Sequence, residues 1–165
     1  MAQMLIDQTV EDVYNLAVGK PAMVRSGDVL KNAVDAMIAN PVSQKVYVVD
    51  GTGKLLGMVT MQSLLEQVGN RIGARKRGAA GFLHFMGDIL HENIEHFMVK
   101  PHKIKKNTTL VEAMKAIVDL KVNNLPIVDA DGILIGELNG LEILTAARKL
   151  FKDRQTLDAE KEAMD

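Results

Sequence analysis

The distribution of apolar residues predicts an α-helix followed by a β-hairpin in the second half of the chain. Apolar side chains recur there at steps of three and four residues, which is the spacing of one helix face. They are Leu110, Ala113, Met114, Ile117 and Val118. Two short apolar runs follow at residues 125–128 and 133–138, and Asp131-Gly132 lies between them. Apolar runs that flank such a turn are typical of a β-hairpin.

The first half of the chain shows the same order of elements. An extended piece at Met23-Val24 precedes a helix, and Lys103-Ile104 holds the equivalent place in the second half. Asp28 and Thr108 are expected to cap the two helices, because their side-chain oxygens can accept hydrogen bonds from free amides of a first turn.

The hairpin of the first half is predicted from apolar runs at 46–49 and 55–59, with Asp50, Gly51 and Gly53 in the turn. A second helix should follow each hairpin. We expect these helices near residues 61–68 and 140–151.

An internal repeat accounts for these parallels. At an offset of 80 residues, several positions of the first half meet identical residues in the second half. Such pairs include Pro21 and Pro101, Leu30 and Leu110, Ala33 and Ala113, Ala36 and Ala116, and Val42 and Val122. Farther along, Gly57 and Leu65 meet Gly136 and Leu144 at an offset of 79, so the first copy has one extra residue in a turn. The chain is therefore expected to fold as two copies of one unit.

Each copy resembles the cystathionine-β-synthase (CBS) domain. The resemblance lies in the extended piece, helix, hairpin and helix, with Leu125-Pro126-Ile127-Val128-Asp129, a glycine-bearing turn and Gly136 before the last helix. It implies an α/β fold of two β-α-β-β-α units packed around a pseudo-two-fold axis, often called a Bateman module. The expected parts are a first motif at 10–68, a basic loop and amphipathic helical connector at 69–92, a second motif at 93–151 and a polar helical tail at 152–165.

Composition excludes several classes of function. Lys and Arg number 20 against 21 Asp and Glu, so no global field attracts nucleic acid or an anionic membrane, and any anion site must be local. The chain has no cysteine, which removes thiol nucleophiles, disulfides and thiolate metal sites. Neither a leader sequence nor a long apolar stretch is recognised, so we expect a cytoplasmic protein with no membrane partner.

The connector has two distinct parts. Residues 71–77 carry Arg71, Arg75, Lys76 and Arg77 but lack the Gly-Lys-Ser/Thr ending of a nucleotide P-loop. This stretch is a solvated linker, a weak phosphate cradle or a contact for RNA or DNA, and we do not expect nucleic acid as a partner. A stripe of apolar residues follows and predicts an amphipathic helix that covers the core or packs against another subunit. The stripe consists of Phe82, Phe85, Met86, Ile89, Leu90, Ile94, Phe97 and Met98.

Catalysis is not expected. The connector contains His84, His91 and His96 together with Glu92 and Glu95. A His-Glu-x-x-His pattern is missing, so we interpret them as a solvated polar face and expect no metal. The sequence also has no Gly-x-Ser-x-Gly nucleophile elbow, and we expect no enzyme activity and no required cofactor.

Binding at helix N-termini is the chemistry that the resemblance implies. The family signature is Gly, two apolar residues, Ser or Thr, two residues and Asp, and its hydroxyl and carboxylate hold an adenosine ligand. The first copy keeps a hydroxyl at Thr60 but has Ser63 at the acid position. The second copy has Asn139 and Glu142 instead. Both pairs also fit the capping pattern that begins a helix, so capping and ligand binding remain alternatives.

The resemblance places the adenine beside the extended piece and the first hairpin strand of either copy. The full set of expected ligand-binding residues is Met23, Val24, Arg25, Val46, Tyr47, Thr60 and Ser63 in the first copy and Lys103, Ile104, Lys105, Leu125, Pro126, Asn139 and Glu142 in the second. Phosphates require nearby cations. Those closest in sequence are Arg25, His102, Lys103, Lys105 and Lys106.

Together these patterns predict a stand-alone regulatory module. It is expected to form a homodimer, to bind AMP, ADP or ATP or a related adenosyl ligand in the cleft between its motifs, and to signal to a regulated protein that the sequence does not identify. The alternative is a ligand-free dimerisation or protein-interaction module in which the degenerate sites serve only as helix caps.

Overall fold

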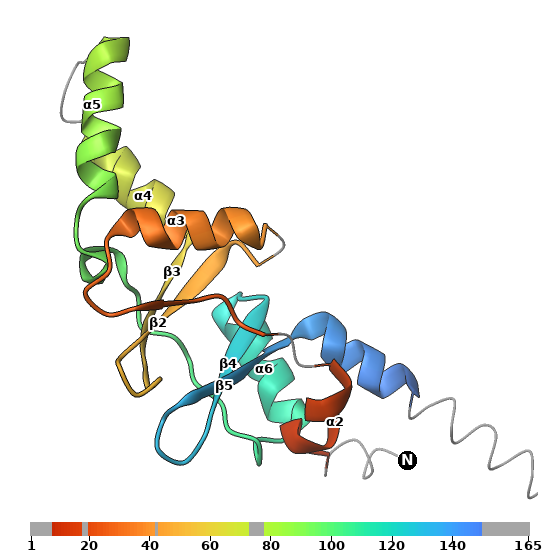
Figure 1. Cartoon of the computed structure of the whole chain (residues 1–165). Coiled ribbons are helices and arrows are strands. Elements are labelled where there is room, and N and C mark those ends of the chain that lie inside the picture. Colours follow the sequence, from red (N-terminus) through yellow and green to blue (C-terminus); the bar gives the residue numbers. More distant parts are fainter. Residues whose placement is uncertain (1–7, 18–19, 42, 73–77, 150–165) are drawn as a thin grey trace, which may run out of the picture. The chain divides into compact units, whose positions relative to one another are not determined.

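The computed structural model describes residues 8–17, 20–41, 43–72 and 78–149. The expected tail at 152–165 and most of the basic loop, residues 73–77, lie outside the described residues. The elements are labelled in Figure 1. In chain order they are α2 (Val10–Ala17), β1 (Met23–Arg25), α3 (Leu30–Ala39), β2 (Lys45–Val49), β3 (Leu55–Thr60), α4 (Met61–Ile72), α5 (Ala79–Leu90), the 3-10 helix η1 (Ile94–Phe97), α6 (Leu110–Leu120), β4 (Asn124–Val128), β5 (Leu134–Asn139) and a last helix described from residue 140 to 149.

The chain forms two compact units. The first unit contains residues 21–101 together with 130–134. The second unit contains the described residues before residue 21, those from His102 to Asp129 and those from Ile135 onward. Each motif therefore shares its unit with a segment from the other half of the sequence. We call β1, α3, β2, β3 and α4 the first motif, and α6, β4, β5 and the last helix the second motif.

The first unit is built on a three-stranded sheet of order β1-β2-β3. Strand β1 runs parallel to β2, and β2 and β3 form the predicted antiparallel hairpin. The hairpin turn is closed by Asp50, whose Oδ1 accepts hydrogen bonds from the Thr52 hydroxyl at 2.6 Å and from the backbone N–H groups of Thr52 at 2.8 Å and Lys54 at 3.0 Å. The turn also needs a glycine at Gly53, where φ is +89°.

One face of this sheet carries the core of the first unit. Alternate strand residues point to it, as period-two alternation requires. The buried members are Val24, Leu30, Ala33, Met37, Val46, Val48, Val59, Leu64, Val68, Ile89, Ile94 and Phe97. They come from all three strands, from α3, α4 and α5, and from η1. The predicted amphipathic connector is thus two elements, because α5 ends at Leu90 and Ile94–Phe97 forms η1.

The second unit has the two-stranded sheet β4-β5, and Ile104 joins it as a parallel bridge to Ile127. Its core again takes residues from segments far apart in the chain. The buried members are Val10, Val13, Ile104, Leu110, Ala113, Leu125, Ile127, Leu138, Ile143 and Ala146. Val10 and Val13 come from α2, so this helix completes the core of the second motif.

In both units, the segment that precedes one copy in the sequence is hydrogen-bonded to the start of the first helix of the other copy. We call these two segments, α2 with the residues before it and residues 92–97, the leading segments. In the second unit, the Val10 N–H donates to the Thr108 carbonyl and the Leu110 N–H to the Gln8 carbonyl, both at 2.8 Å. In the first unit, the Ile94 N–H donates to the Asp28 carbonyl and the Leu30 N–H to the Glu92 carbonyl, both at 2.9 Å. The segment that precedes each copy in sequence therefore packs on the other copy.

Both first helices begin one residue later than the sequence suggests. The N-caps are Val29 and Thr109 instead of Asp28 and Thr108. The Asp28 carboxylate accepts from the Arg25 N–H at 2.9 Å and the Thr108 hydroxyl accepts from the Lys105 N–H at 3.0 Å. These side chains close the turn before each helix, because a short polar side chain can bond to the backbone of a turn as readily as to a helix start.

Candidate binding positions in the two motifs

The first motif presents a second sheet face, opposite the core, that carries several expected ligand residues. Met23 pairs with Tyr47 across β1 and β2, and Tyr47 pairs with Met58 across β2 and β3. Lys45 pairs with Thr60. Directly paired residues share a face of a sheet. Tyr47 and Thr60, which the resemblance links to adenine and ribose, therefore lie on the same face as Met23.

Thr60 and Ser63 form a reciprocal cap at the start of α4. The Ser63 N–H donates to the Thr60 hydroxyl at 3.0 Å, and the Thr60 N–H donates to the Ser63 hydroxyl at 3.1 Å. The Ser63 hydroxyl also donates to the Thr60 carbonyl at 3.0 Å. Capping thus accounts for the spacing of this pair, and each hydroxyl oxygen retains acceptor capacity for a further donor.

Gly57, the glycine of the signature, has a packing role. A Cβ atom at this position would lie 2.8 Å from Met98 Sδ, which is too close for van der Waals contact. The segment carrying Met98 runs beside β3, since the N–H groups of Met58 and Val99 donate to each other's carbonyls at 3.0 and 2.8 Å. A side chain at Gly57 would force this segment away.

The second motif repeats the arrangement with different side chains. The Ile104 N–H donates to the Pro126 carbonyl at 3.0 Å, which sets the extended piece beside β4. The Asn139 N–H donates to Glu142 Oε2 at 2.7 Å, and the Glu142 N–H donates to Asn139 Oδ1 at 2.9 Å. Asn139 and Glu142 therefore form a complete capping box at the start of the last helix.

Several expected ligand residues have their side chains in the cores. Val24, Val46, Ile104 and Leu125 are at most 8% exposed and belong to the two buried clusters. Only their backbone atoms remain for a ligand. The exposed members are Met23, Arg25, Lys103 and Lys105, whereas Thr60, Ser63, Asn139 and Glu142 are partly exposed at the helix starts.

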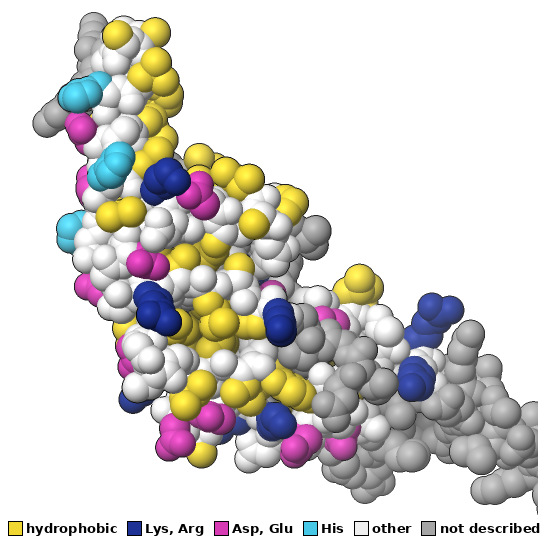
Figure 2. All heavy atoms as spheres, in the orientation of Figure 1, with side chains coloured by type: hydrophobic (Ala, Val, Ile, Leu, Met, Phe, Trp, Pro, Cys, Tyr) yellow, Lys and Arg dark blue, Asp and Glu magenta, His cyan; other side chains and the backbone are white. Residues whose placement is uncertain are grey.

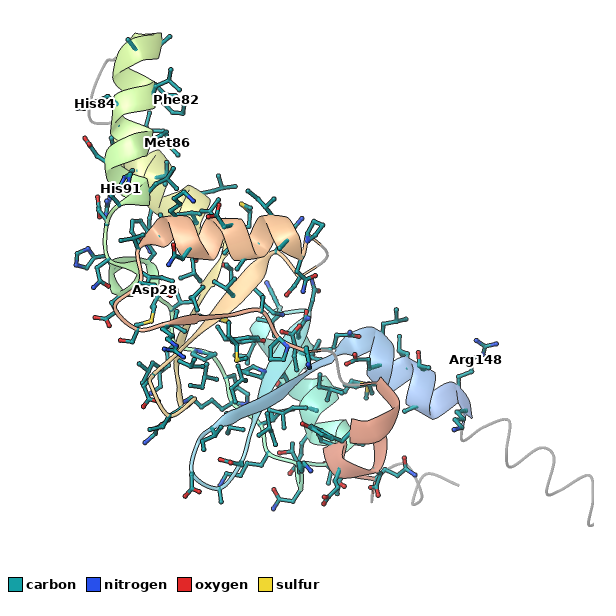
Figure 3. The ribbon with its side chains drawn as sticks, in the orientation of Figure 1. Asp28, Phe82, His84, Met86, His91 and Arg148 are labelled. Atoms are coloured by element: carbon teal, nitrogen blue, oxygen red, sulfur yellow. The ribbon has the colours of Figure 1, made fainter. Side chains whose placement is uncertain are left out.

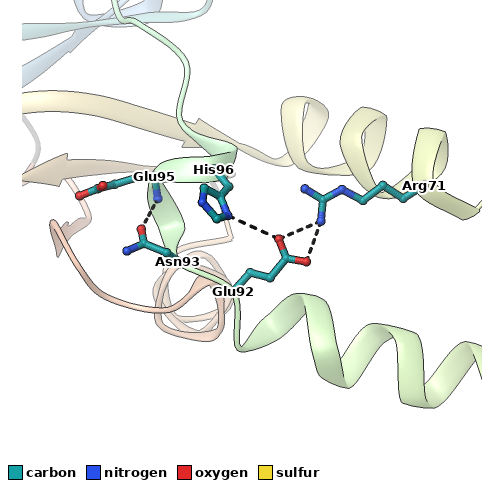
Figure 4. A network of polar contacts seen from close by, with 5 residues as sticks. All are labelled: Arg71, Glu92, Asn93, Glu95 and His96. Atoms are coloured by element: carbon teal, nitrogen blue, oxygen red, sulfur yellow. Dashed lines mark hydrogen bonds and ion pairs between the residues drawn. The ribbon is translucent and has the colours of Figure 1, made fainter.

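Two cations are engaged inside their own units. Lys106 lies 3.7 Å from the Glu11 carboxylate and 4.3 Å from the centre of the Tyr14 ring, so it connects the second motif to α2. Nη1 of Arg71 donates to both Glu92 carboxylate oxygens at 2.7 and 2.9 Å (Figure 4). The guanidinium group of Arg71 also lies over the Phe97 ring, 5.1 Å from its centre. Arg71 therefore connects α4 to the segment after α5. One of the four basic residues of the connector thus stabilises the fold.

The histidines of the connector are spread apart. Figure 3 shows His84 and His91 on the side of α5 opposite Phe82 and Met86. His91 Nδ1 lies 2.7 Å from the Gly87 carbonyl, and His96 Nδ1 lies 3.7 Å from Glu92 Oε2. In the part of the chain that the structure describes, no three His, Asp or Glu side chains are grouped to hold a metal ion.

Two neighbours of the candidate positions are not indicated by the hydrophobic pattern. The apolar run that predicts β2 begins at Val46, whereas the strand begins one residue earlier at Lys45, whose side chain is 8% exposed. In the second motif, the Asn124 amide donates to the Glu137 carboxylate. Lys45 becomes a neighbour of Thr60 only through strand pairing, so no local signal marks it. Glu137 could have been noticed as a charged residue at an apolar position of the signature.

The architecture defines a tandem repeat of small α/β motifs with capped helices at the candidate sites. The family model described as "CBS domain" matches residues 8–70 and 94–149. The chain belongs to the CBS domain family and is a tandem CBS pair. The resemblance and the expected repeated α/β fold are thereby confirmed.

Solved structures of CBS proteins have the same fold. A CBS domain-containing protein from Thermotoga maritima is 32% identical, with a TM-score of 0.65, over 87% of this chain and 96% of that one. CBSX2 of Arabidopsis thaliana, solved in complex with AMP, is 24% identical with a TM-score of 0.62 over 87% and 98% of the two chains. A CBS domain-containing protein from Bacillus anthracis is 19% identical with a TM-score of 0.71 over 90% and 99%. A search of curated proteins gave no significant match.

Among the described helices, none combines the length and the apolar character needed to cross a bilayer.

Proposed function

We propose that this CBS pair is a non-catalytic regulatory module of the cytoplasm that binds an adenine nucleotide at one or both motifs and transmits its occupancy to a partner protein. The observation that carries the proposal is the pair of capped helix starts at the family signature, with hydroxyls at Thr60 and Ser63 and a carboxylate at Glu142. Helix N-termini favour anionic groups because of their free amides and their positive dipole end. CBSX2 with AMP supports adenine nucleotide as the ligand class.

The caps leave capacity for a ligand. A carboxylate offers about four lone-pair positions, and the Glu142 carboxylate uses Oε2 for the Asn139 N–H. A ribose hydroxyl can donate to the same carboxylate without breaking the cap. At the first motif the Thr60 hydroxyl is the equivalent acceptor, and the rings of adenine and Tyr47 would lie on the same sheet face. In this mechanism the ligand adds contacts to a preformed helix start.

The module is further proposed to act as a homodimer. The described part of α5 exposes Phe82 at 45% and Leu83 at 71%, and Figure 2 shows apolar side chains along this helix. Phe82 and Met86 lie on one side of α5 in Figure 3, as the amphipathic pattern predicts. Burying such a face against a second copy would remove the apolar surface from water.

The second candidate is a ligand-free interaction module. It is favoured by the complete reciprocal caps at both signatures, because these caps explain the residues without any ligand. In this case the regulated partner would recognise the folded pair itself.

Nucleotide binding distinguishes the two candidates. Purified protein is denatured, and the supernatant is tested for nucleotide that was bound during purification. The melting temperature of nucleotide-free protein is then measured with AMP, ADP and ATP, and with GMP as the guanine control. Adenine nucleotides should raise the melting temperature, since a ligand at a hundredfold excess over Kd adds about 2.7 kcal/mol to stability. Unchanged melting with every adenine nucleotide would exclude the sensor and favour the interaction module.

A further inference from the structure

The hairpin turns of the two motifs are joined to each other by backbone hydrogen bonds. The Leu55 N–H donates to the Gly132 carbonyl at 3.0 Å. The Leu134 N–H donates to the Gly53 carbonyl, also at 3.0 Å. At an offset of 79 residues the two leucines are equivalent, and so are the two glycines, so each copy contributes the same donor and the same acceptor.

Lys54 and Ile133 lie opposite each other between these two hydrogen bonds, as an antiparallel bridge. We call residues 53–55 and 132–134 the strap. The turn of the second hairpin, residues 130–134, belongs to the first unit, whereas β4 and the rest of β5 belong to the second unit. The strap thus connects the two motifs inside the first unit.

The two turns also pack against each other. A Cβ atom at Gly53 would lie 3.4 Å from Cγ2 of Ile133. A Cβ atom at Gly132 would lie 3.4 Å from Cε of Lys54. Each glycine therefore faces the central strap residue of the other turn, so side-chain packing accompanies the two hydrogen bonds.

The strap lies at the start of both strands that lead to the candidate binding positions. Strand β3 begins at Leu55 and ends at Thr60, which caps α4. Strand β5 begins at Leu134 and ends at Asn139, which caps the last helix. A two-stranded hairpin such as β4-β5 is marginally stable by itself, so its turn gains needed support from the first motif.

We propose that the strap couples the opening of the two motifs, so that stabilisation of one motif, by a bound nucleotide or by a change in its core, also protects the other. Opening of the second hairpin breaks the strap hydrogen bonds, and their loss exposes the turn of the first hairpin as well. A ligand that restricts opening at one motif then reduces opening at the other. The coupling goes beyond the proposed function, because it is a property of the ligand-free fold.

Hydrogen exchange measures the coupling through two backbone amides, one in each unit. The Tyr47 N–H donates to the Ala22 carbonyl in the first unit at 2.9 Å. The Val128 N–H donates to the Ile104 carbonyl in the second unit, also at 2.9 Å. Ile89→Val perturbs the first unit, since Ile89 is 1% exposed in its core. In the parent, this substitution should lower the protection of both amides by about twofold to tenfold.

Charges at the centre of the strap supply matched variants. Lys54 is exposed, so Ile133→Glu places an opposite charge across from it and Ile133→Lys places a like charge there. Both variants lose the same isoleucine. Ile133→Glu should keep the response of both amides to Ile89→Val, whereas Ile133→Lys should confine the response to the Tyr47 amide. Adding Lys54→Glu to each variant should reverse the two results.

A disulfide tests the strap without any repulsive pair. Opposite residues of a non-hydrogen-bonded antiparallel pair have Cα atoms about 4.5 Å apart, which suits a disulfide, and the chain has no cysteine of its own. In Lys54→Cys combined with Ile133→Cys, oxidation should raise the protection of both amides relative to the reduced protein. A rise at the Tyr47 amide alone would overturn the coupling.

The remaining outcomes separate the strap from the proposed function. The role of the strap is overturned if the Val128 amide does not respond to Ile89→Val in the parent, or if it responds equally in every charge variant. AMP added to the parent should raise the protection of both amides, and a rise at one amide alone contradicts the coupling. If AMP changes neither amide, the proposed function fails, while the strap is still decided by the ligand-free results.

Discussion

The two motifs have the same fold but different side chains at equivalent positions. The first motif places Lys45, Tyr47 and Thr60 on one sheet face, and the second has Asn124, Pro126 and Asn139 at these places. Their caps also differ, with two hydroxyls at α4 and an amide and a carboxylate at the last helix. Both copies thus keep the hydrogen bonds that cap the helix start, although the side chains beside the cap differ in charge between the two copies.

The largest effect is expected at the leading segments, on which both motifs depend. Phe97 of η1 is fully buried in the first unit, and Val13 of α2 is 2% exposed in the second. Phe97→Ala should lower the free energy of unfolding by about 3–5 kcal/mol, and Val13→Ala by about 2 kcal/mol, because each leaves a cavity. Urea unfolding measures both.

Ile38→Ala is the control for these core variants, since Ile38 of α3 is 71% exposed and should change stability little. If Val13→Ala is as stable as the wild type, the second motif does not depend on α2. The two leading segments would then not be equivalent in their contribution to stability.

Gly57 offers a smaller effect that is specific to the first motif. Gly57→Ala should destabilise the protein by about 1–3 kcal/mol, because its Cβ atom would overlap Met98. A Cβ atom at Gly69 in α4 would meet nothing within 4 Å, so Gly69→Ala should instead stabilise by about 0.5–1 kcal/mol. A double-mutant cycle with Met98→Ala in thermal or urea unfolding should show coupling between residues 57 and 98. Additive effects would contradict the packing role of Gly57.

Glu142→Gln tests whether the second motif binds ribose. Glutamine can complete the capping box with Asn139, so the ligand-free protein should lose little stability. Nucleotide binding should weaken by about 1–2 kcal/mol, because a neutral contact replaces a charge-assisted one, and adenine base should be unaffected. Calorimetry on Glu142→Gln and Thr60→Val assigns the site: binding that is lost only in Thr60→Val belongs to the first motif.

The smallest effect concerns the first helices of the two motifs. Helix α6 starts with a capping box of Thr109 and Glu112, and the hydrogen bonds from the Thr109 N–H and hydroxyl lower the pKa of Glu112 below its ordinary value of 4.5. A lowered pKa in the folded state means that the stabilisation is present above the unfolded pKa and is lost as the pH falls through the folded one. Helix α3 has Val29 and Asn32 at these positions, which do not titrate.

Unfolding by urea between about pH 6 and pH 3 should therefore show a loss of stability that Glu112→Gln makes slightly smaller. Val29→Thr combined with Asn32→Glu should introduce the same acid-sensitive cap into α3. An unchanged pH profile in both variants would mean that the two helix starts do not differ in this respect.

The sequence predicts the elements well because they depend on local patterns. Both hairpins are found within one residue at each end, since their apolar runs and glycine turns are short-range signals. The break between α5 and η1 is not predicted, because the apolar spacing continues from Ile89 to Ile94 while the chain turns at His91. The exchange of leading segments is also not predicted, as nothing local in Val10 or Val13 indicates a partner about a hundred residues away.

The candidate positions are predicted less completely. Thr60, Ser63, Asn139 and Glu142 follow from the signature and do lie at helix starts. Their role as ligand contacts stays a prediction. Lys45 and Glu137 depend on strand pairing, which brings residues 45 and 60, and 124 and 137, together across a hairpin. Pairing register, and not sequence distance, decides these neighbours.

The exchanged leading segments have a consequence for synthesis of the protein. Helix α2 leaves the ribosome before either motif, but the core that receives Val10 and Val13 is completed by Ile143 and Ala146 of the last helix of the second motif. The first motif instead meets Ile94 and Phe97 soon after its own strands are made. Domains generally fold as their residues emerge, so the first motif should fold before the second motif is made, whereas α2 waits until the last helix of the second motif has been synthesised.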